Sequence, residues 1–354
     1  MPSEADPPQM LLVTSIPPRF GGADEARQLS RVGLTMADAM ASFEASGFRV
    51  VSVNRAGEAA GIQGFPSVEI REVPPGGLFP NKYGPNFARL FAQFGDAPGA
   101  IVNADIVLLP SNVGAVIATR PGTVLFARRL DVSTAASSVI GTYHRGIDGI
   151  FFAGGALAEV AADADVGAFQ VGAPYWDVII PVVASLHRPI EFVPAPFLLH
   201  EIHPARWNKA DYKRLREAAV RTALAHAERW RADRPRADAF LRGLESYVGG
   251  KVDFASDRSI KAAAVYMNLW LGQFDSRPSD TVAVDFNAPV AARFVRQIFS
   301  HSAEALSVAK WLDARLDEGE PNFFMKLRRV ARLMLKTRKA QRRAARVRAL
   351  FPDS

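Results

Sequence analysis

The sequence contains no cysteine among its 354 residues. This absence excludes disulfide bonds, thiolate metal sites and a cysteine nucleophile. No apolar run reaches the ~20 residues that a membrane-spanning helix needs. The Pro-rich, acidic start of the sequence, residues 1–8, also lacks the apolar core of a signal peptide. We therefore expect a cytoplasmic location.

The excess of positive charge is confined to a segment near the C-terminus. Residues 326–351 contain eleven Lys and Arg and no Asp or Glu, and removing them from the net charge of +7 leaves −4 for the rest of the chain. Apolar residues on one side of this segment (Leu327, Val330, Met334 and Leu335) favour peripheral contact with an anionic membrane at its inner face. Nucleic acid is not expected as a partner, because no recognisable nucleic-acid module accompanies the tail. A solvated helix is the alternative.

Short apolar runs that alternate with helical periodicities predict an α/β protein. The expected strands are 10–16, 48–54, 68–73, 100–109, 123–129, 146–152 and 191–194, and the expected helices between them are 29–46, 85–94 and 178–183. This order is typical of a mainly parallel, Rossmann-like sheet flanked by helices. Ligands of such sheets bind at the carboxyl ends of strands, where Ser15, Asn54 and Asp105 fall.

From about residue 208 onward the sequence is rich in Ala, Arg and Leu and has helical periodicity. Helices are expected at roughly 208–247, 259–274, 288–316 and 322–350. This change in composition divides the chain into an α/β domain over 10–205, a helical subdomain over 206–320 and a basic C-terminal helix or tail over 321–354.

The motif Asn103-Ala104-Asp105, within the predicted strand 100–109, is the first candidate for a site. Two oxygen-bearing side chains spaced by one residue lie on the same face of a strand. That arrangement suits a hard divalent cation and the phosphate oxygens that it carries. An Asp that caps the turn after a strand is the alternative interpretation. A second Asp-x-Asp pattern, residues 163–165, follows no apolar strand and is interpreted as a solvated loop.

Six segments occur in an order that is known from one protein family. They are Leu12–Arg19, Gly47–Asn54, Asn103–Ile106, Gly146–Phe152, Gly172–Asp177 and the segment that carries His200 and His203. Together they resemble the nucleotide-diphospho-sugar transferases of GT-A fold. The resemblance covers about residues 10–205 and depends on the order of the elements more than on any single motif. It implies a GT-A-like sheet with a helical C-terminal extension.

The resemblance also implies a metal site. In that family an Asp-x-Asp motif holds a divalent metal, Mn²⁺ or Mg²⁺, on the diphosphate of the sugar nucleotide. Asp105 is then the metal-binding carboxylate, and His200, after the last strand, completes the site. Asn103 departs from the pattern, because the family has Asp there. We expect Asn103 to hydrogen-bond the ribose or a metal-bound water, and its effect on metal affinity is an open question.

Further residues are assigned by the same resemblance. Ser15 and Asn54, which fall at strand ends, and Arg19 are expected to contact the donor nucleotide. Arg19 would meet a phosphate at the edge of the sheet, and a surface Arg is the alternative. Asp148 is expected near the donor sugar or the acceptor, and a turn residue between two glycines is the alternative. For His200, a satisfied surface or interface histidine is the alternative.

Asp177 is the candidate general base. It follows Tyr175-Trp176 and matches the position of the acidic residue in similar inverting enzymes. A carboxylate beside aromatic surface has its pKa raised by desolvation, as a base that works near neutral pH requires. The alternative is that Asp177 caps the apolar helix that follows.

These assignments lead to a predicted function. Transfer from a nucleoside diphosphate sugar leaves negative charge on the departing diphosphate, which a metal or cationic side chains must neutralise. We expect a metal-assisted glycosyltransferase that acts on a hydroxyl of a carbohydrate or lipid-linked acceptor, in surface polysaccharide synthesis. A sugar-nucleotide nucleotidyltransferase is the second hypothesis, although no Gly-rich, Lys/Arg-containing phosphate loop follows the first strand. A non-catalytic, membrane-associated scaffold with a degenerate fold is the third.

Overall fold

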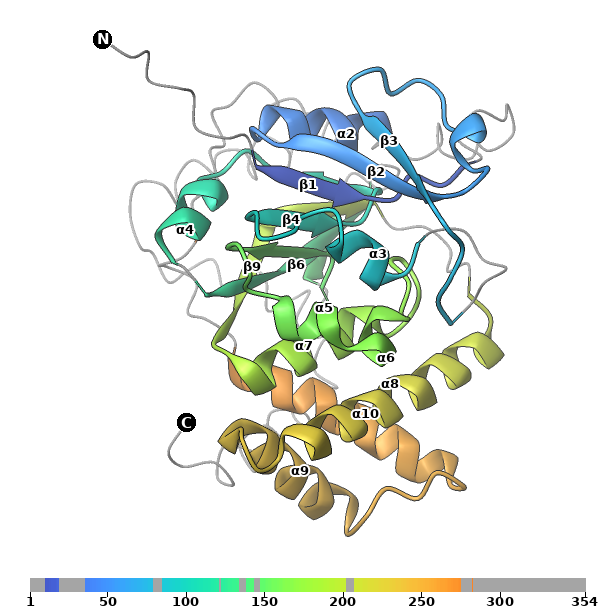
Figure 1. Cartoon of the computed structure of the whole chain (residues 1–354), viewed down its shortest axis with the longest axis vertical. Helices are drawn as coiled ribbons and strands as arrows, with labels where there is room; N and C mark the ends of the chain where they lie inside the picture. The colour runs from blue at the N-terminus through green and yellow to red at the C-terminus, as the bar shows by residue number, and fades with distance from the viewer. Residues whose placement is uncertain are drawn as a thin grey trace.

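The computed structural model describes residues 10–18, 36–78, 85–120, 122–133, 138–142, 147–201, 207–274 and 282. Over these residues one curled sheet, a half-barrel, carries helices on both faces and a helical region beyond them (Figure 1). The strands, in their order across the sheet, are β3 (Glu69–Val73), β2 (Arg49–Arg55), β1 (Leu11–Thr14), β4 (Gly99–Val102), β8 (Gly149–Phe152), β6 (Val124–Ser133), β9 (Ile190–Glu201) and β5 (Ile106–Leu108). β7 (Ser138–Thr142) pairs with β6 outside this order.

The sheet is mixed, so the prediction of a mainly parallel sheet is wrong. β1 runs parallel to β2 and β4, β2 to β3, and β6 to β9. β8, however, runs antiparallel to both of its neighbours, β4 and β6, and β5 runs antiparallel to β9. A parallel neighbour needs a long crossover, which is usually a helix. Among the described residues between β6 and β8 there is no helix, and β7 returns along β6 instead. Apolar runs identify strands but not their direction.

The predicted strand 100–109 is in fact two strands. β4 ends at Val102, β5 begins at Ile106, and Ala104 and Asp105 form a turn between them. β8, β6 and β9 separate the two strands in the sheet. The expectation that Asn103 and Asp105 share one face of a strand is therefore wrong, because a turn does not keep the two-residue alternation of a strand.

Side chains that alternate along the central strands build an apolar layer on each face of the sheet. Val13 and Ile101 point to one layer, whereas Leu12 and Ala100 point to the other. The layer around Leu12 is covered by α2 (Met36–Ala45) and α4 (Val113–Thr119). The layer around Val13 is covered by α3 (Phe87–Phe91), α5 (Ala158–Ala162), α6 (Ala164–Gly167) and α7 (Trp176–His187). Ten of the twelve residues of α7 are buried, because it lies between the sheet and the helices that follow (Figure 1).

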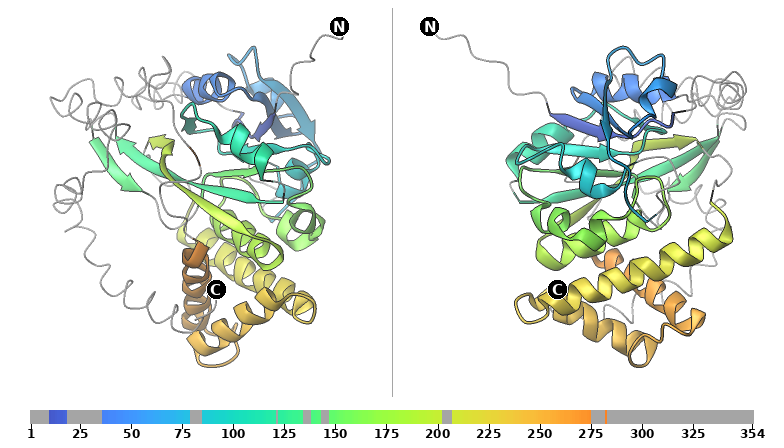
Figure 2. Two further views of the ribbon diagram at one scale, coloured as in Figure 1. Left: turned by 90° about the vertical axis from the view of Figure 1, so that its left-hand side faces the viewer. Right: turned by 45° about the vertical axis from the view of Figure 1, so that its right-hand side comes forward.

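Three helices form a further layer against α7 (Figure 2). They are α8 (Lys209–Trp230), α9 (Pro235–Val248) and α10 (Asp257–Leu271), and short 3₁₀ turns occur at η1 (Ala59–Gly61) and η2 (Gly272–Phe274). The predicted helix 208–247 is two helices, because Pro235 starts α9 at a position that suits its missing N–H. Apolar residues of all three helices join the same core cluster as α7.

Most other predicted elements within the described residues agree in position with observed ones to within a few residues, but the predicted strand 191–194 covers only the first part of β9. β5 was predicted only as part of the strand 100–109, and β7 and α4 to α6 were not predicted. The predicted helices 288–316 and 322–350, the basic segment 326–351 and Arg19 lie wholly outside the described residues. None of the described helices is both long and apolar enough to cross a membrane.

A buried polar chain connects α6, α7 and α8. Asp163, predicted to lie in a solvated loop, is buried and accepts hydrogen bonds from two backbone N–H groups of α6. Its Oδ2 lies 2.5 Å from Nδ1 of His226 and 2.9 Å from Nη1 of Arg229. Nε2 of His226 in turn lies 2.6 Å from Nε2 of His187. Burial and the neighbouring His226 lower the pKa of His187 to about 4, and burial also lowers the pKa of His226 despite Asp163.

This histidine pair predicts a loss of stability in mild acid. Its contribution to the free energy of unfolding is complete above about pH 6.5 and falls toward pH 4, because the unfolded chain binds the protons first. Asp177, whose pKa is raised, makes the free energy of unfolding change in the opposite direction over this pH range. The wild type must therefore be compared with a variant that lacks His187. Urea unfolding at pH 7 and pH 5 should show a larger loss in the wild type than in His187→Gln. Equal losses in the two proteins would contradict the prediction.

Candidate functional site

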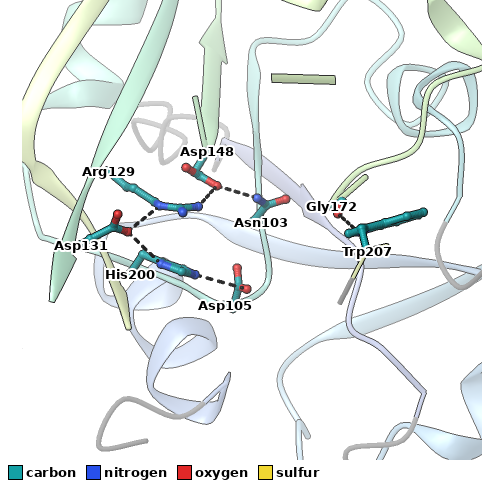
Figure 3. Close-up of polar contacts among 8 residues, drawn as sticks. All are labelled: Asn103, Asp105, Arg129, Asp131, Asp148, Gly172, His200 and Trp207. Atoms are coloured by element: carbon teal, nitrogen blue, oxygen red, sulfur yellow. Dashed lines mark hydrogen bonds and ion pairs between the residues drawn. The ribbon is translucent and has the colours of Figure 1, made fainter. Parts of the chain in front are cut away.

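The candidate site lies where the turn after β4 meets the end of β9 (Figure 3). His200 of β9 is in register with Asp131 of β6 on one side and Ile106 of β5 on the other. β9 thus places the imidazole between two carboxylates. Nδ1 of His200 lies 3.0 Å from Oδ1 of Asp131, and Nε2 lies 3.7 Å from Oδ2 of Asp105. His200 is buried and Asp105 is exposed, so this pair opens to solvent at Asp105.

The two carboxylates control the ionisation of His200. Burial alone would lower its pKa, but Asp105 and Asp131 outweigh burial and raise the pKa of His200 to about 9. The short contact with Asp131 assigns a proton to Nδ1, since a carboxylate can only accept. Nε2 is then the nitrogen that faces Asp105.

Arg129 connects the group of His200, Asp105 and Asp131 to a third carboxylate, that of Asp148. Arg129 and Asp131 are two residues apart on β6 and share a face. Nε of Arg129 donates to Oδ1 of Asp131 at 2.8 Å, and Nη1 donates to Oδ1 of Asp148 at 2.9 Å. Burial opposes the charge of Arg129, but Asp148 and Asp131 outweigh it and raise its pKa. Arg129 is therefore a permanent cation within an acidic site.

Asp148 is held rigidly just before β8. Its carbonyl accepts from the backbone N–H of Asn103 at 3.2 Å, and its own N–H donates to Ala127 at 3.1 Å. Oδ1 also accepts from Nδ2 of Asn103 at 2.8 Å. Oδ2 is buried and has no hydrogen-bond partner within the described structure. Burial raises the pKa of Asp148 although Arg129 opposes the shift. An orphaned buried oxygen of this kind can accept a hydrogen bond from a ligand.

Asp177 reaches the same group of charges from α7. Burial and, next, the charge of Asp148 raise its pKa to about 8, while Arg129 and backbone N–H groups of Tyr175 and of Asp177 itself oppose the shift. The N-cap of α7 is Tyr175, at the left-handed φ of 72°, and its side chain makes no capping bond. Asp177 is the second residue of α7 and Tyr175 occupies the N-cap position, so the structure does not place Asp177 as the cap of this helix.

The predicted donor-binding residues lie along the same edge of the sheet. β1 and β4 are parallel neighbours with Val13 opposite Ile101, so Ser15 after β1 and Asn103 after β4 extend beyond the same ends. Asn54 is fully buried, and its Nδ2 donates to the carbonyl of Ile16 at 2.6 Å. Its Oδ1 accepts from Ser52, whose hydroxyl oxygen accepts the N–H of Ile16. Asn54 thus fixes the backbone beside Ser15 and is better placed to position this loop than to touch a ligand.

The structure brings five of the predicted residues together: Asn103, Asp105, Asp148, Asp177 and His200. Arg129 and Asp131, which connect them, were not predicted as site residues. The sequence did contain a signal for this pair. Arg129 and Asp131 are two residues apart at the end of an apolar strand, and this spacing places both charges on one face of the strand. Their partners come from distant parts of the chain, so the sequence did not show which charges they meet.

Asp105 and Nε2 of His200 are two candidate ligands for a divalent cation, which would have to displace the proton that the raised pKa of His200 keeps on the imidazole. Their 3.7 Å separation exceeds a hydrogen bond and leaves space for an ion bonded to both, at about 2.1 Å from each. Asp131 holds the other imidazole nitrogen, as carboxylates commonly do behind metal-ligating histidines. In the part of the chain that the structure describes, no three His, Asp or Glu side chains gather as a metal site. Ligands from the substrate or from water would thus have to complete the coordination.

Comparisons with known proteins add no family assignment. No protein-family model matches the sequence, and no curated protein matches it significantly.

Proposed function

We propose that the protein is a metal-assisted glycosyltransferase of GT-A-like fold, which transfers a sugar from a nucleoside diphosphate sugar to an acceptor hydroxyl. The observation that carries the proposal is the arrangement of Asp105, His200 and Asp177 around the Arg129–Asp148 ion pair. It combines a donor pair for a cation with a half-buried carboxylate whose pKa is raised to about 8, in the range of a general base. The edge of the sheet between β1 and β4 supports the nucleotide site, because ligands of α/β sheets bind at strand ends.

Asp105 and His200 are the residues that would hold the cation, and the imidazole favours Mn²⁺ over Mg²⁺. When bound, the cation supplies neutralisation of the charge on the departing diphosphate. Asp131 orients the His200 ring through Nδ1. Arg129 keeps Asp131 and Asp148 in place and offsets part of their negative charge.

Asp177 acts as the base of an inverting transfer. The acceptor oxygen forms a bond to the anomeric carbon of the sugar as the bond from that carbon to the diphosphate oxygen breaks. The electron pair of the broken bond stays on the diphosphate, and the proton of the acceptor hydroxyl moves to Asp177. Oδ2 of Asp148 accepts a hydrogen bond from a sugar hydroxyl, which satisfies its buried lone pairs.

A base with a raised pKa predicts a rate that depends on pH. Transfer should increase from pH 6 to pH 9 with a midpoint near pH 8, because only deprotonated Asp177 takes the proton. The measurement is kcat/KM for the donor at saturating metal and acceptor. The binding constant of a nucleoside diphosphate, measured over the same range, should lack this midpoint. A flat or falling rate profile would contradict the assignment of Asp177.

The proposed activity is tested with a panel of sugar nucleotides, with and without Mn²⁺ and with simple sugar acceptors. Mn²⁺-dependent release of nucleoside diphosphate is expected. Release of pyrophosphate would instead support the nucleotidyltransferase, and the absence of turnover would support the scaffold. A cytoplasmic location, synthesis of a surface polysaccharide and contact of the basic segment 326–351 with the inner face of the membrane complete the proposal.

A further inference from the structure

The turn that leads into α7 has a demanding backbone conformation. Gly172 has a φ of 73° and Tyr175 a φ of 72°, and Tyr175 is the one non-glycine residue with positive φ among those that the structure describes. A residue that carries a Cβ, such as Tyr175, disfavours the left-handed region of φ. Contacts with other parts of the chain must therefore hold the turn in this conformation. Asp177 follows two residues later, and its place in the site therefore depends on what holds Tyr175.

The core fixes two residues of this turn, Ala173 and Trp176. Both are buried, and Trp176 stacks on Phe87 at a ring distance of 5.2 Å. Gly172 is exposed and Tyr175 is half-buried, so neither is held by apolar packing to the same degree. Two further contacts of the turn come from the helical layer.

Trp207 makes the first of these contacts. Its indole Nε1 donates to the carbonyl oxygen of Gly172 at 3.0 Å (Figure 3). Trp207 directly precedes Asn208, which caps α8 by accepting the N–H of Asp211 at 2.9 Å. The donor therefore stands at a fixed helix end, and the hydrogen bond joins α8 to the turn before Asp177.

Arg216 makes the second contact. Its guanidinium is near enough to the Tyr175 hydroxyl to oppose the rise that burial causes in the pKa of Tyr175, and its Nη2 lies 2.5 Å from Oδ1 of Asp257 in the first turn of α10. Arg216 is thus oriented by a second helix of the same layer. α8, through Arg216, and α10, through Asp257, thereby both act on Tyr175, the residue with the left-handed φ.

We propose that Trp207 and Arg216 are positioning residues, which hold the turn at Gly172 and Tyr175 and so fix the carboxylate of Asp177 beside Asp148 and Arg129. The inference rests on the proposed function, because it gives the helical layer a part in the chemistry of that site. Neither side chain touches the reacting atoms. Each acts through the backbone that carries Asp177.

The test measures the ionisation of Asp177, which needs no turnover. Its carboxyl carbon is followed by NMR over pH 5–10 in protein labelled at aspartate, and Asp177→Asn assigns the signal. In the wild type the midpoint should lie near pH 8. Trp207→Phe keeps the ring and removes the donor, and it should lower the midpoint by at least about one unit, because a loosened turn lets water reach the carboxylate. Arg216→Met should act in the same direction.

Two matched variants serve as controls. The indole of Trp270 donates to the hydroxyl of Ser185, near the other end of α7, at 2.8 Å. Arg221 lies on α8 one turn or more beyond Arg216 and pairs with Glu217. Trp270→Phe and Arg221→Met should leave the Asp177 midpoint unchanged. Thermal melting of all four variants checks that each of them is folded under the conditions of the titration.

The outcomes separate this inference from the proposed function. A midpoint that stays near pH 8 in both Trp207→Phe and Arg216→Met overturns the inference, as does an equal shift in the controls. With an active donor, kcat should fall about tenfold and KM for the donor should stay within about twofold in both variants. If the wild type transfers no sugar but the midpoint shifts as expected, the positioning role stands and the glycosyltransferase proposal fails.

Discussion

Replacing Asp177 by Asn is expected to lower kcat for sugar transfer by about 10²- to 10⁴-fold, which is the usual contribution of a general base. Asn has nearly the shape of the protonated carboxyl group but cannot accept the proton of the acceptor. Donor affinity should remain within about twofold, because the base acts in the transition state rather than in donor binding. Steady-state kinetics and calorimetric titration of the nucleoside diphosphate measure the two quantities.

The control is Asp165→Asn, which changes an exposed carboxylate in the first turn of α6, another helix on the same face of the sheet. This variant should transfer sugar at the wild-type rate. Asp177→Asn should also unfold at nearly the wild-type temperature, since at neutral pH the buried carboxyl group is largely protonated. Transfer at a near wild-type rate in Asp177→Asn would remove Asp177 from the mechanism. A large loss of stability would favour a capping role instead.

Replacing Asp105 by Ala is expected to weaken Mn²⁺-dependent donor binding by at least 10- to 100-fold, the loss that is typical even of residues behind metal ligands. Asp105 is exposed, so its truncation leaves no cavity and the fold should be intact. Titration of UDP or GDP with and without Mn²⁺ measures the effect. Asp96→Ala, in an exposed turn before β4, is the matched control. Unchanged metal-dependent affinity in Asp105→Ala would contradict the proposed cation site.

Asn103→Asp is the companion to this experiment. From the family pattern, a second carboxylate at this position would be expected to tighten metal binding. In the structure, however, the amide of Asn103 donates to Oδ1 of Asp148 at 2.8 Å. A carboxylate there would face the buried Asp148 and repel it. We therefore expect Asn103→Asp to melt at a lower temperature and to bind Mn²⁺ no more tightly than the wild type.

The contrast at Asn103 shows what the sequence could and could not indicate. The motif lies where several charged groups converge, but it was predicted to lie inside a strand, whereas the structure has a turn there. It did not show that Asn103 and Asp105 point to different partners, because that depends on the end of β4 at Val102. Asn at this position is explained by its partner: a carboxylate needs a donor beside it, which a second carboxylate cannot supply.

The positions of helices and strands could be predicted better than the way in which they pack and pair. Apolar runs and helical spacing located β1 to β3, β6 and α7 to within a few residues. The antiparallel direction of β8 and the curl that brings β5 next to β9 depend on pairing between distant segments. Those pairings place Asp131 and Asp105 on either side of His200, so the polar network of the site could not be derived from local patterns.

Asp177 shows what tertiary context adds to an expectation from the sequence. The neighbouring aromatic residues indicated a desolvated carboxylate, and burial does raise its pKa to about 8. The sequence did not indicate the second cause, the charge of Asp148, or the left-handed Tyr175 before α7, because both depend on tertiary contacts. Helical spacing predicted the helices of the layer but not their contacts with the turn before Asp177.

The most direct test of the proposed site is a crystal structure with Mn²⁺ and a nucleoside diphosphate, in which anomalous scattering locates the metal. The account predicts one strong Mn²⁺ peak bonded to a carboxylate oxygen of Asp105 and to Nε2 of His200, with the diphosphate on the metal and Asp177 on the sugar side of it. A nucleoside diphosphate bound elsewhere, or a metal that avoids both Asp105 and His200, would contradict it.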